Sequence, residues 1–107
     1  MARSIRVFYT GQHGKGIRKN FNWPPINQKS AVLITAAEFQ FPGGLGGLES
    51  IRPNLGAAAI WVTNVGAHGA GTEAGGVEFL LNVDWPSPLN VMVTITVLED
   101  IEQFVEA

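Results

Sequence analysis

The residues of this chain that could do chemistry suit hydrogen bonding and stacking better than bond breaking. Two histidines, His13 and His68, stand in separate glycine-rich segments, and no nucleophile has a base within a plausible loop. The chain has no cysteine, which excludes disulfides and thiolate metal sites. We therefore expect no catalytic residues, no cofactor and no metal site. Calcium would have to draw on Glu73 and Asp84, which are scattered along the chain.

One set of polar and aromatic side chains matches the chemistry that sugar binding requires. The apolar face of a pyranose stacks on an aromatic ring, while its hydroxyl groups bond to planar polar side chains. If successive strands alternate in direction, the loops after the first, third and fifth strands share one end of the fold. The candidates for carbohydrate binding that gather there, with Lys15 beside them, are Gln12, His13, Arg52, Asn54, Asp84 and Trp85. The same alternation puts His13 and His68 at opposite ends.

Each of these residues also has a simpler interpretation. Trp85 stands at an inward-facing position of its strand and would then cap the core, and Asp84 would be an exposed carboxylate at a strand end. Trp23 and Trp61 are expected in the core or in a subunit interface. The glycine-rich segment 11–16 has no Walker pattern and is interpreted as the loop of a hairpin.

The elements that must position these residues are strands. Alternation of apolar and polar residues, with β-branched and aromatic enrichment, predicts six of them. Their ranges are 5–10, 17–23, 31–41, 57–65, 77–85 and 91–98. Glycine and proline separate them at 11–16, 41–56, 66–76 and 85–88, and the tail 100–107 suits a last strand or a helical turn. This order predicts one domain over residues 1–107, an all-β antiparallel sandwich.

Low charge points to a covered apolar surface. Charged residues make up 15% of the chain, compared with about a quarter in average globular domains. In the segment 91–98, Val91, Val93, Ile95 and Val97 alternate with Met92, Thr94, Thr96 and Leu98, so both faces can be buried. We therefore expect that strand to meet a second sheet or a partner subunit.

The charges are unevenly distributed along the chain. Six of the seven basic residues lie in the first thirty positions, and four acidic residues lie in the last nine. A basic half is compatible with nucleic-acid binding, but no nucleic-acid motif accompanies it, so we favour a first and a last strand lying side by side. No apolar run is long enough to cross a membrane. Arg3 and Arg6 precede a strand-like segment, so we expect a cytoplasmic protein or one exported by a non-classical route.

The order of segments resembles the H-type lectin domain. Three passages carry the likeness: Lys-Asn-Phe-Asn-Trp-Pro-Pro at 19–25 before the apolar run 31–35, Thr-Asn-Val at 63–65 before Gly-Val-Glu-Phe at 76–79, and Asp-Trp at 84–85 before the alternating run 91–97. The resemblance implies a secreted six-stranded sandwich that forms trimers or hexamers and binds N-acetylgalactosamine or related sugars. The family's sugar-binding tryptophan corresponds to Trp85.

Other binding residues of that family have no counterpart here. The polar residue beside its tryptophan is Pro86, its first-loop aspartate falls near Gln12 and His13, and its arginine falls near Ala57, with Arg52 in the preceding loop. These departures argue against N-acetylgalactosamine specificity. The first hypothesis is a non-enzymatic, oligomeric carbohydrate-binding module. The second is a structural self-assembling subunit of a phage, coat or appendage, without a small ligand. A hydrolytic enzyme is a distant third.

Overall fold

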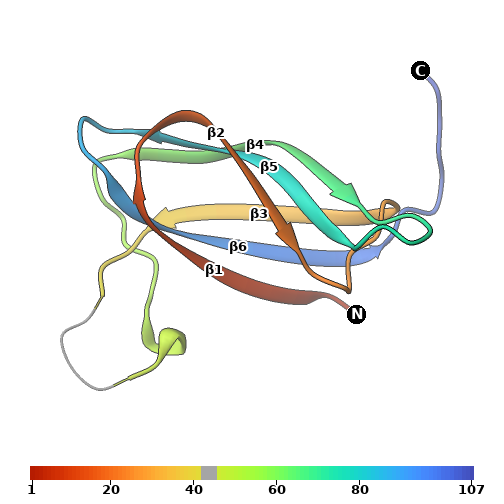
Figure 1. The fold of residues 1–107 in the computed structure, drawn as a ribbon, viewed down its shortest axis with the longest axis horizontal. Coiled ribbons are helices and arrows are strands. Elements are labelled where there is room, and N and C mark those ends of the chain that lie inside the picture. The colour runs from red at the N-terminus through yellow and green to blue at the C-terminus, as the bar shows by residue number, and fades with distance from the viewer. Residues whose placement is uncertain (42–45) are drawn as a thin grey trace.

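A computed structural model describes residues 1–41 and 46–107 and confirms the all-β prediction (Figure 1). Four strands are longer than the sequence pattern predicts, the third is shorter and the fifth has the predicted length, and the tail after Asp100 has no regular structure. The strands are β1 (Arg3–Gln12), β2 (Gly14–Asn22), β3 (Ser30–Glu38), β4 (Ala59–His68), β5 (Gly76–Asp84) and β6 (Leu89–Asp100), and a short 3₁₀ helix, η1 (Leu48–Ser50), precedes β4. The predicted long loop 41–56 includes residues 42–45, which lie outside the described part of the chain.

Two antiparallel three-stranded sheets form the fold, with orders β1-β6-β3 and β2-β5-β4. The central strands β5 and β6 supply most of the core, because their inward side chains face each other between the sheets. These buried side chains are Val77, Phe79, Leu81, Val83, Val91, Val93, Ile95 and Val97, joined by Ile26. Trp23 packs against this core, as predicted. Trp61 alternates outward on β4 and is 38% exposed, so it is not part of the core. The alternative, a subunit interface, stays a prediction.

The segment 11–16 is an arch between the two sheets, and the hairpin prediction was wrong. β1 pairs with β6 and β2 pairs with β5, so no ladder joins β1 to β2. The registers shift between Tyr9 and Gln12 and again between Gly14 and Ile17. Gly11, Gly14 and Gly16 all have positive φ, which glycine adopts without steric cost. These glycines let the chain bulge and cross from one sheet to the other.

The outer face of the β1-β6-β3 sheet is partly covered by the chain itself. Phe39 and Ile51, from the connection between β3 and β4, bury Met92 in a second small cluster. Phe8 joins this cluster and meets the Phe39 ring edge-to-face at 5.1 Å. Further along β6, Thr94 and Thr96 are half-buried and Leu98 is exposed. The second face of the 91–98 segment is therefore covered by a loop at one end and open at the other.

The first and last strands lie side by side, as the charge pattern predicts. Across the described ranges 1–41 and 46–107, the ion pair found joins the Met1 ammonium to Glu99 at 2.9 Å, and this ammonium lowers the pKa of Glu99. The basic side chains of β1 are paired differently. Arg6 donates to Thr94, and the guanidinium of Arg3 lies 5.7 Å from the centre of the Trp23 ring.

Tyr9 makes the stability of the fold sensitive to alkaline pH. Its half-buried ring packs against the core, with the Lys19 ammonium 4.4 Å from the ring centre, and burial raises the pKa of Tyr9 above 10.0. The folded state therefore holds the phenol proton to higher pH than the unfolded state. As pH rises from about 10 through the raised pKa, stability should fall.

Tyr9→Phe should remove this alkaline loss, because Tyr9 is the chain's single tyrosine. The measurement is urea unfolding of both proteins at pH 8 and pH 11. We expect the free energy of unfolding to drop more for the wild type than for the variant. Burial lowers the pKa of Lys19 and so acts in the opposite direction, but it does so in both proteins. An equal drop in the two proteins would contradict the assignment.

Candidate functional site

The alternating strands bring the connections that carry the predicted site residues to one end of the sandwich. Figure 1 shows the β1–β2, β3–β4 and β5–β6 connections at the left end, and the other two connections with both termini at the right end. His13 belongs to the left end and His68, the last residue of β4, to the right end. The two histidines therefore lie at opposite ends, as strand alternation predicts.

Two of the three connections run side by side. Gln12 is opposite Leu89 and Gly14 is opposite Val83, so the turn at His13 crosses between the sheets next to residues 85–88. The backbone N–H of Gly11 donates to the Asn90 side-chain oxygen at 3.2 Å, which ties the end of β1, before the first crossing, to the start of β6, after the second. The geometry thus brings His13 close to the segment that follows Asp84.

Trp85 stands at the exposed start of the second crossing. It is 39% exposed and is not among the side chains that form or pack against the core, so it does not cap the core. Asp84 precedes it as an exposed carboxylate at the end of β5. Pro86 and Pro88 follow, and their rings fix φ, so the tryptophan sits on a backbone with little freedom. The exposed ring offers a stacking surface, and the exposed Asp84 carboxylate offers hydrogen-bond acceptors at the same strand end.

The side chains of the β1–β2 arch differ in how freely they can meet a ligand. The Gln12 amide nitrogen donates to the Thr10 carbonyl oxygen at 2.8 Å, so this side chain helps to hold the arch. His13 and Lys15 are exposed. We therefore take His13, Asp84 and Trp85 together as the arch site.

Arg52 and Asn54 do not join the arch site. They line a separate surface cavity of ≈ 280 Å³ with Gln40 and Ser50, and the Asn54 N–H donates to the Glu38 carbonyl at 2.8 Å. This bond places Asn54 along the outer edge of β3. Across the sheet, Asn54 is three strand spacings, about 14 Å, from β1, and two spacings, about 10 Å, from β6, the strand that follows Trp85. The predicted set of six residues is therefore divided into two groups.

A polar pocket that the sequence interpretation missed lies at the opposite end, on the outer face of the β2-β5-β4 sheet. It measures ≈ 320 Å³ and is lined by Asn20, Asn22, His68, Glu73, Ala74 and Glu78. His68 Nδ1 is 2.9 Å from the Ala74 carbonyl oxygen and Nε2 is 2.7 Å from Asn20 Oδ1. The outward alternation of Asn20 and Asn22 could have revealed this pocket. None of these lining residues is a phenylalanine, tyrosine or tryptophan, so the pocket lacks the broad stacking surface that an indole provides.

The acidic residues of the described chain do not gather into a metal site. Glu73 and Asp84 lie at opposite ends of the sandwich, so they cannot share a calcium ion. Within residues 1–41 and 46–107, no group of three or more histidine, aspartate or glutamate side chains is close enough to hold a metal ion. No helix in this part of the chain is long and apolar enough to cross a membrane.

The arch site combines an exposed indole, a carboxylate and an imidazole at the end of a rigid sandwich. This arrangement can bind a ligand with one apolar face and several hydroxyl groups. Comparisons with models of known protein families, with curated proteins and with solved structures find no match to this chain.

Proposed function

We propose that this chain is a carbohydrate-binding module without catalytic activity, and that the arch site of His13, Asp84 and Trp85 binds the sugar. The observation that carries the proposal is the exposure of Trp85 beside Asp84 on a proline-restrained crossing. A core tryptophan would have left this end of the sandwich without a stacking surface. Because the ring is exposed, sugar binding is a better interpretation of Trp85 than a role as a cap of the core.

The chemistry of the arch site suits a pyranose. Stacking on the indole removes apolar area of both groups from water, and the Asp84 carboxylate accepts charge-assisted hydrogen bonds from sugar hydroxyl groups. His13, from the neighbouring arch, supplies a further donor or acceptor. Because one exposed site of this kind binds weakly, we propose that the module acts as a homo-oligomer whose linked sites raise avidity.

A glycan array tests the proposal. The intact wild-type protein is applied to immobilised glycans of varied terminal sugars and linkages, and we expect reproducible binding to a subset that shares a terminal residue. Asp84→Asn, which keeps the shape of the side chain but removes its charge, should reduce the signal on the same glycans. A wild-type protein that is folded and binds no glycan would defeat the proposal.

A structural self-assembling subunit is the second candidate, and one observation favours it. Large apolar side chains are exposed on the outer faces of both sheets, Leu33 on β3 and Trp61 on β4. A subunit that packs through both faces would cover them without any ligand. Mass measurement in solution separates the candidates, because contacts that do not close into a ring produce filaments or shells whose mass grows with concentration.

A further inference from the structure

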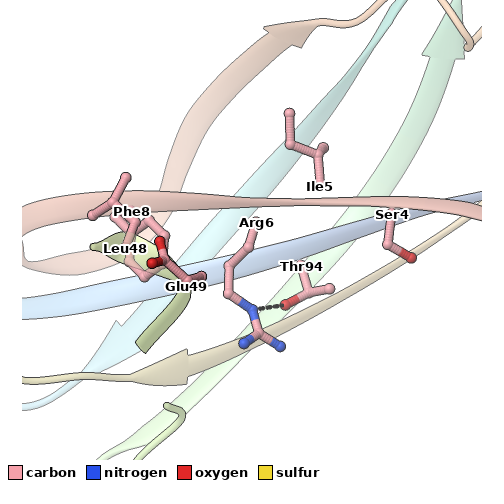
Figure 2. Close-up of a pocket in the computed structure, with 7 residues that line it drawn as sticks. All are labelled: Ser4, Ile5, Arg6, Phe8, Leu48, Glu49 and Thr94. Carbon is pink, nitrogen blue, oxygen red and sulfur yellow. Dashed lines mark hydrogen bonds between the residues drawn. The ribbon is translucent and has the colours of Figure 1, made fainter. Parts of the chain in front are cut away.

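A groove crosses the open part of the outer face of the β1-β6-β3 sheet. It measures ≈ 340 Å³, and its lining residues come from β1, β6 and the short helix η1. Figure 2 shows these residues: Ser4, Ile5, Arg6, Phe8, Leu48, Glu49 and Thr94. Leu48 and Phe8 lie together in that view, and the Arg6 guanidinium extends away from the sheet beside Thr94. We call this the β1–η1 groove.

The groove has an apolar end and a cationic end. Leu48 is largely exposed, and it lines the groove together with Phe8. Arg6 Nε donates to the Thr94 hydroxyl at 2.9 Å, and no carboxylate of the described chain lies within ion-pair distance of Arg6. The Glu49 carboxylate is folded back against Gly47, where it fills the space of a potential Cβ. The terminal guanidinium nitrogens of Arg6 are thus open to an incoming anion.

The tail 101–107 has the complementary chemistry. It leaves the body at the end where β6 finishes and projects away from both sheets (Figure 1). The Ile101 N–H donates to the Lys29 carbonyl at 2.8 Å, but Phe104 is 70% and Val105 84% exposed. In an extended chain, alternate residues share a face, so Glu102, Phe104 and Glu106 would present an aromatic ring between two carboxylates.

The tail cannot serve the groove of its own chain. Phe8 is opposite Met92, which is eight residues before Asp100 in β6, or about 27 Å along the strand. Phe104 follows Asp100 by four residues, so the tail carries its backbone at most about 14 Å back along the strand. The Phe104 ring therefore falls short of the apolar end of the groove.

We propose that the β1–η1 groove binds the tail of a second copy of this chain. Phe104 packs on Leu48 and Phe8, and a carboxylate of Glu102 or Glu106 pairs with Arg6. This inference rests on the oligomeric part of the proposed function and is independent of sugar binding. The groove is lined by one cation, Arg6, and one carboxylate, Glu49, and Glu49 does not pair with Arg6. Arg6 can therefore pair with a carboxylate of the tail, while Phe104 suits the apolar end of the groove.

The experiment compares the masses of three chains in solution: the wild type, a chain that ends at Ile101, and Arg6→Glu. We expect the wild type to associate, and each of the other two to be monomeric when alone. A one-to-one mixture of the two should form a heteromeric complex, because the intact tail of Arg6→Glu can enter the intact groove of the shortened chain. Arg18→Glu, an exposed arginine on the other sheet, is the matched control and should associate like the wild type.

Two further measurements keep the proposal falsifiable. Phe104→Ala changes an exposed tail residue that the fold does not need, and it should raise the dissociation constant of the oligomer about tenfold. A monomeric wild type, a shortened chain that still associates, or a mixture that stays monomeric would overturn the proposal. Glycan binding by the shortened chain is measured separately, so a failure of the groove and a failure of the arch site give different results.

Discussion

Trp85→Ala is expected to lower the affinity for a bound glycan by about 30-fold at a single site, because removing a stacking aromatic ring costs about 2 kcal/mol. The ring is 39% exposed in the free protein, so its loss also removes covered apolar surface and should lower the free energy of unfolding. Affinities are therefore compared under conditions in which the variant is folded. Calorimetric titration with a glycan identified on the array gives the affinity. Urea unfolding gives the stability of the same samples.

Phe104→Ala is the control for this experiment. Phe104 is 70% exposed and follows the end of β6, at the end of the sandwich opposite the arch site. Trp61 cannot serve, because it is opposite Asn82 and lies two residues from Ala59, the partner of Asp84. The Phe104→Ala replacement removes an exposed aromatic ring and should leave the affinity per site unchanged. If the two variants lost affinity equally, or if Trp85→Ala bound as well as the wild type, stacking at the arch site would be refuted.

Phe79→Ala should cause the largest loss of stability among single substitutions discussed for this chain. Phe79 is 2% exposed, lies on the central strand β5 and faces the core between the two sheets. Truncation of a buried phenylalanine removes apolar contacts and leaves a cavity that the neighbouring strands close only in part. The expected cost is about 3–5 kcal/mol, a large share of the stability of a small domain. Urea unfolding at neutral pH measures it.

The control for Phe79→Ala is Leu55→Ala. Leu55 is fully exposed in the connection before β4, so its truncation should change the free energy of unfolding by less than about 0.5 kcal/mol. A small effect of Phe79→Ala, comparable to that of the control, would show that the core does not depend on this side chain. That result would argue against the packing of β5 against β6 described above.

The succession of six strands along the chain and the buried core positions could be predicted from the sequence, because alternation with period two reports directly on burial. The run 77–85 alternates clearly, and its apolar positions Val77, Phe79, Leu81 and Val83 are the buried face of β5. The pairing of β1 could be predicted only in part. Alternation does not report partners, and the glycines with positive φ at 11, 14 and 16 produce an arch where the sequence suggested a hairpin.

The division of the candidate site could not be predicted for a different reason. Strand alternation correctly assigned Arg52 and Asn54 to the same end as Trp85, but it does not describe how a long connection folds. Phe39 and Ile51 anchor the β3–β4 connection on the outer face of the β1-β6-β3 sheet. This anchoring draws Arg52 and Asn54 towards the edge of β3. Two apolar residues in a glycine-rich loop carry no pattern that shows which face they will cover.

The central claim is that a sugar binds at the arch site, and a nuclear magnetic resonance titration of the isotope-labelled wild-type protein tests it most directly. A glycan identified on the array is added stepwise while amide and indole N–H signals are followed. We predict that the largest shifts occur at His13, Asp84 and Trp85, including the Trp85 indole N–H. Absence of shifts, or shifts confined to the polar pocket around His68 at the opposite end, would contradict the claim.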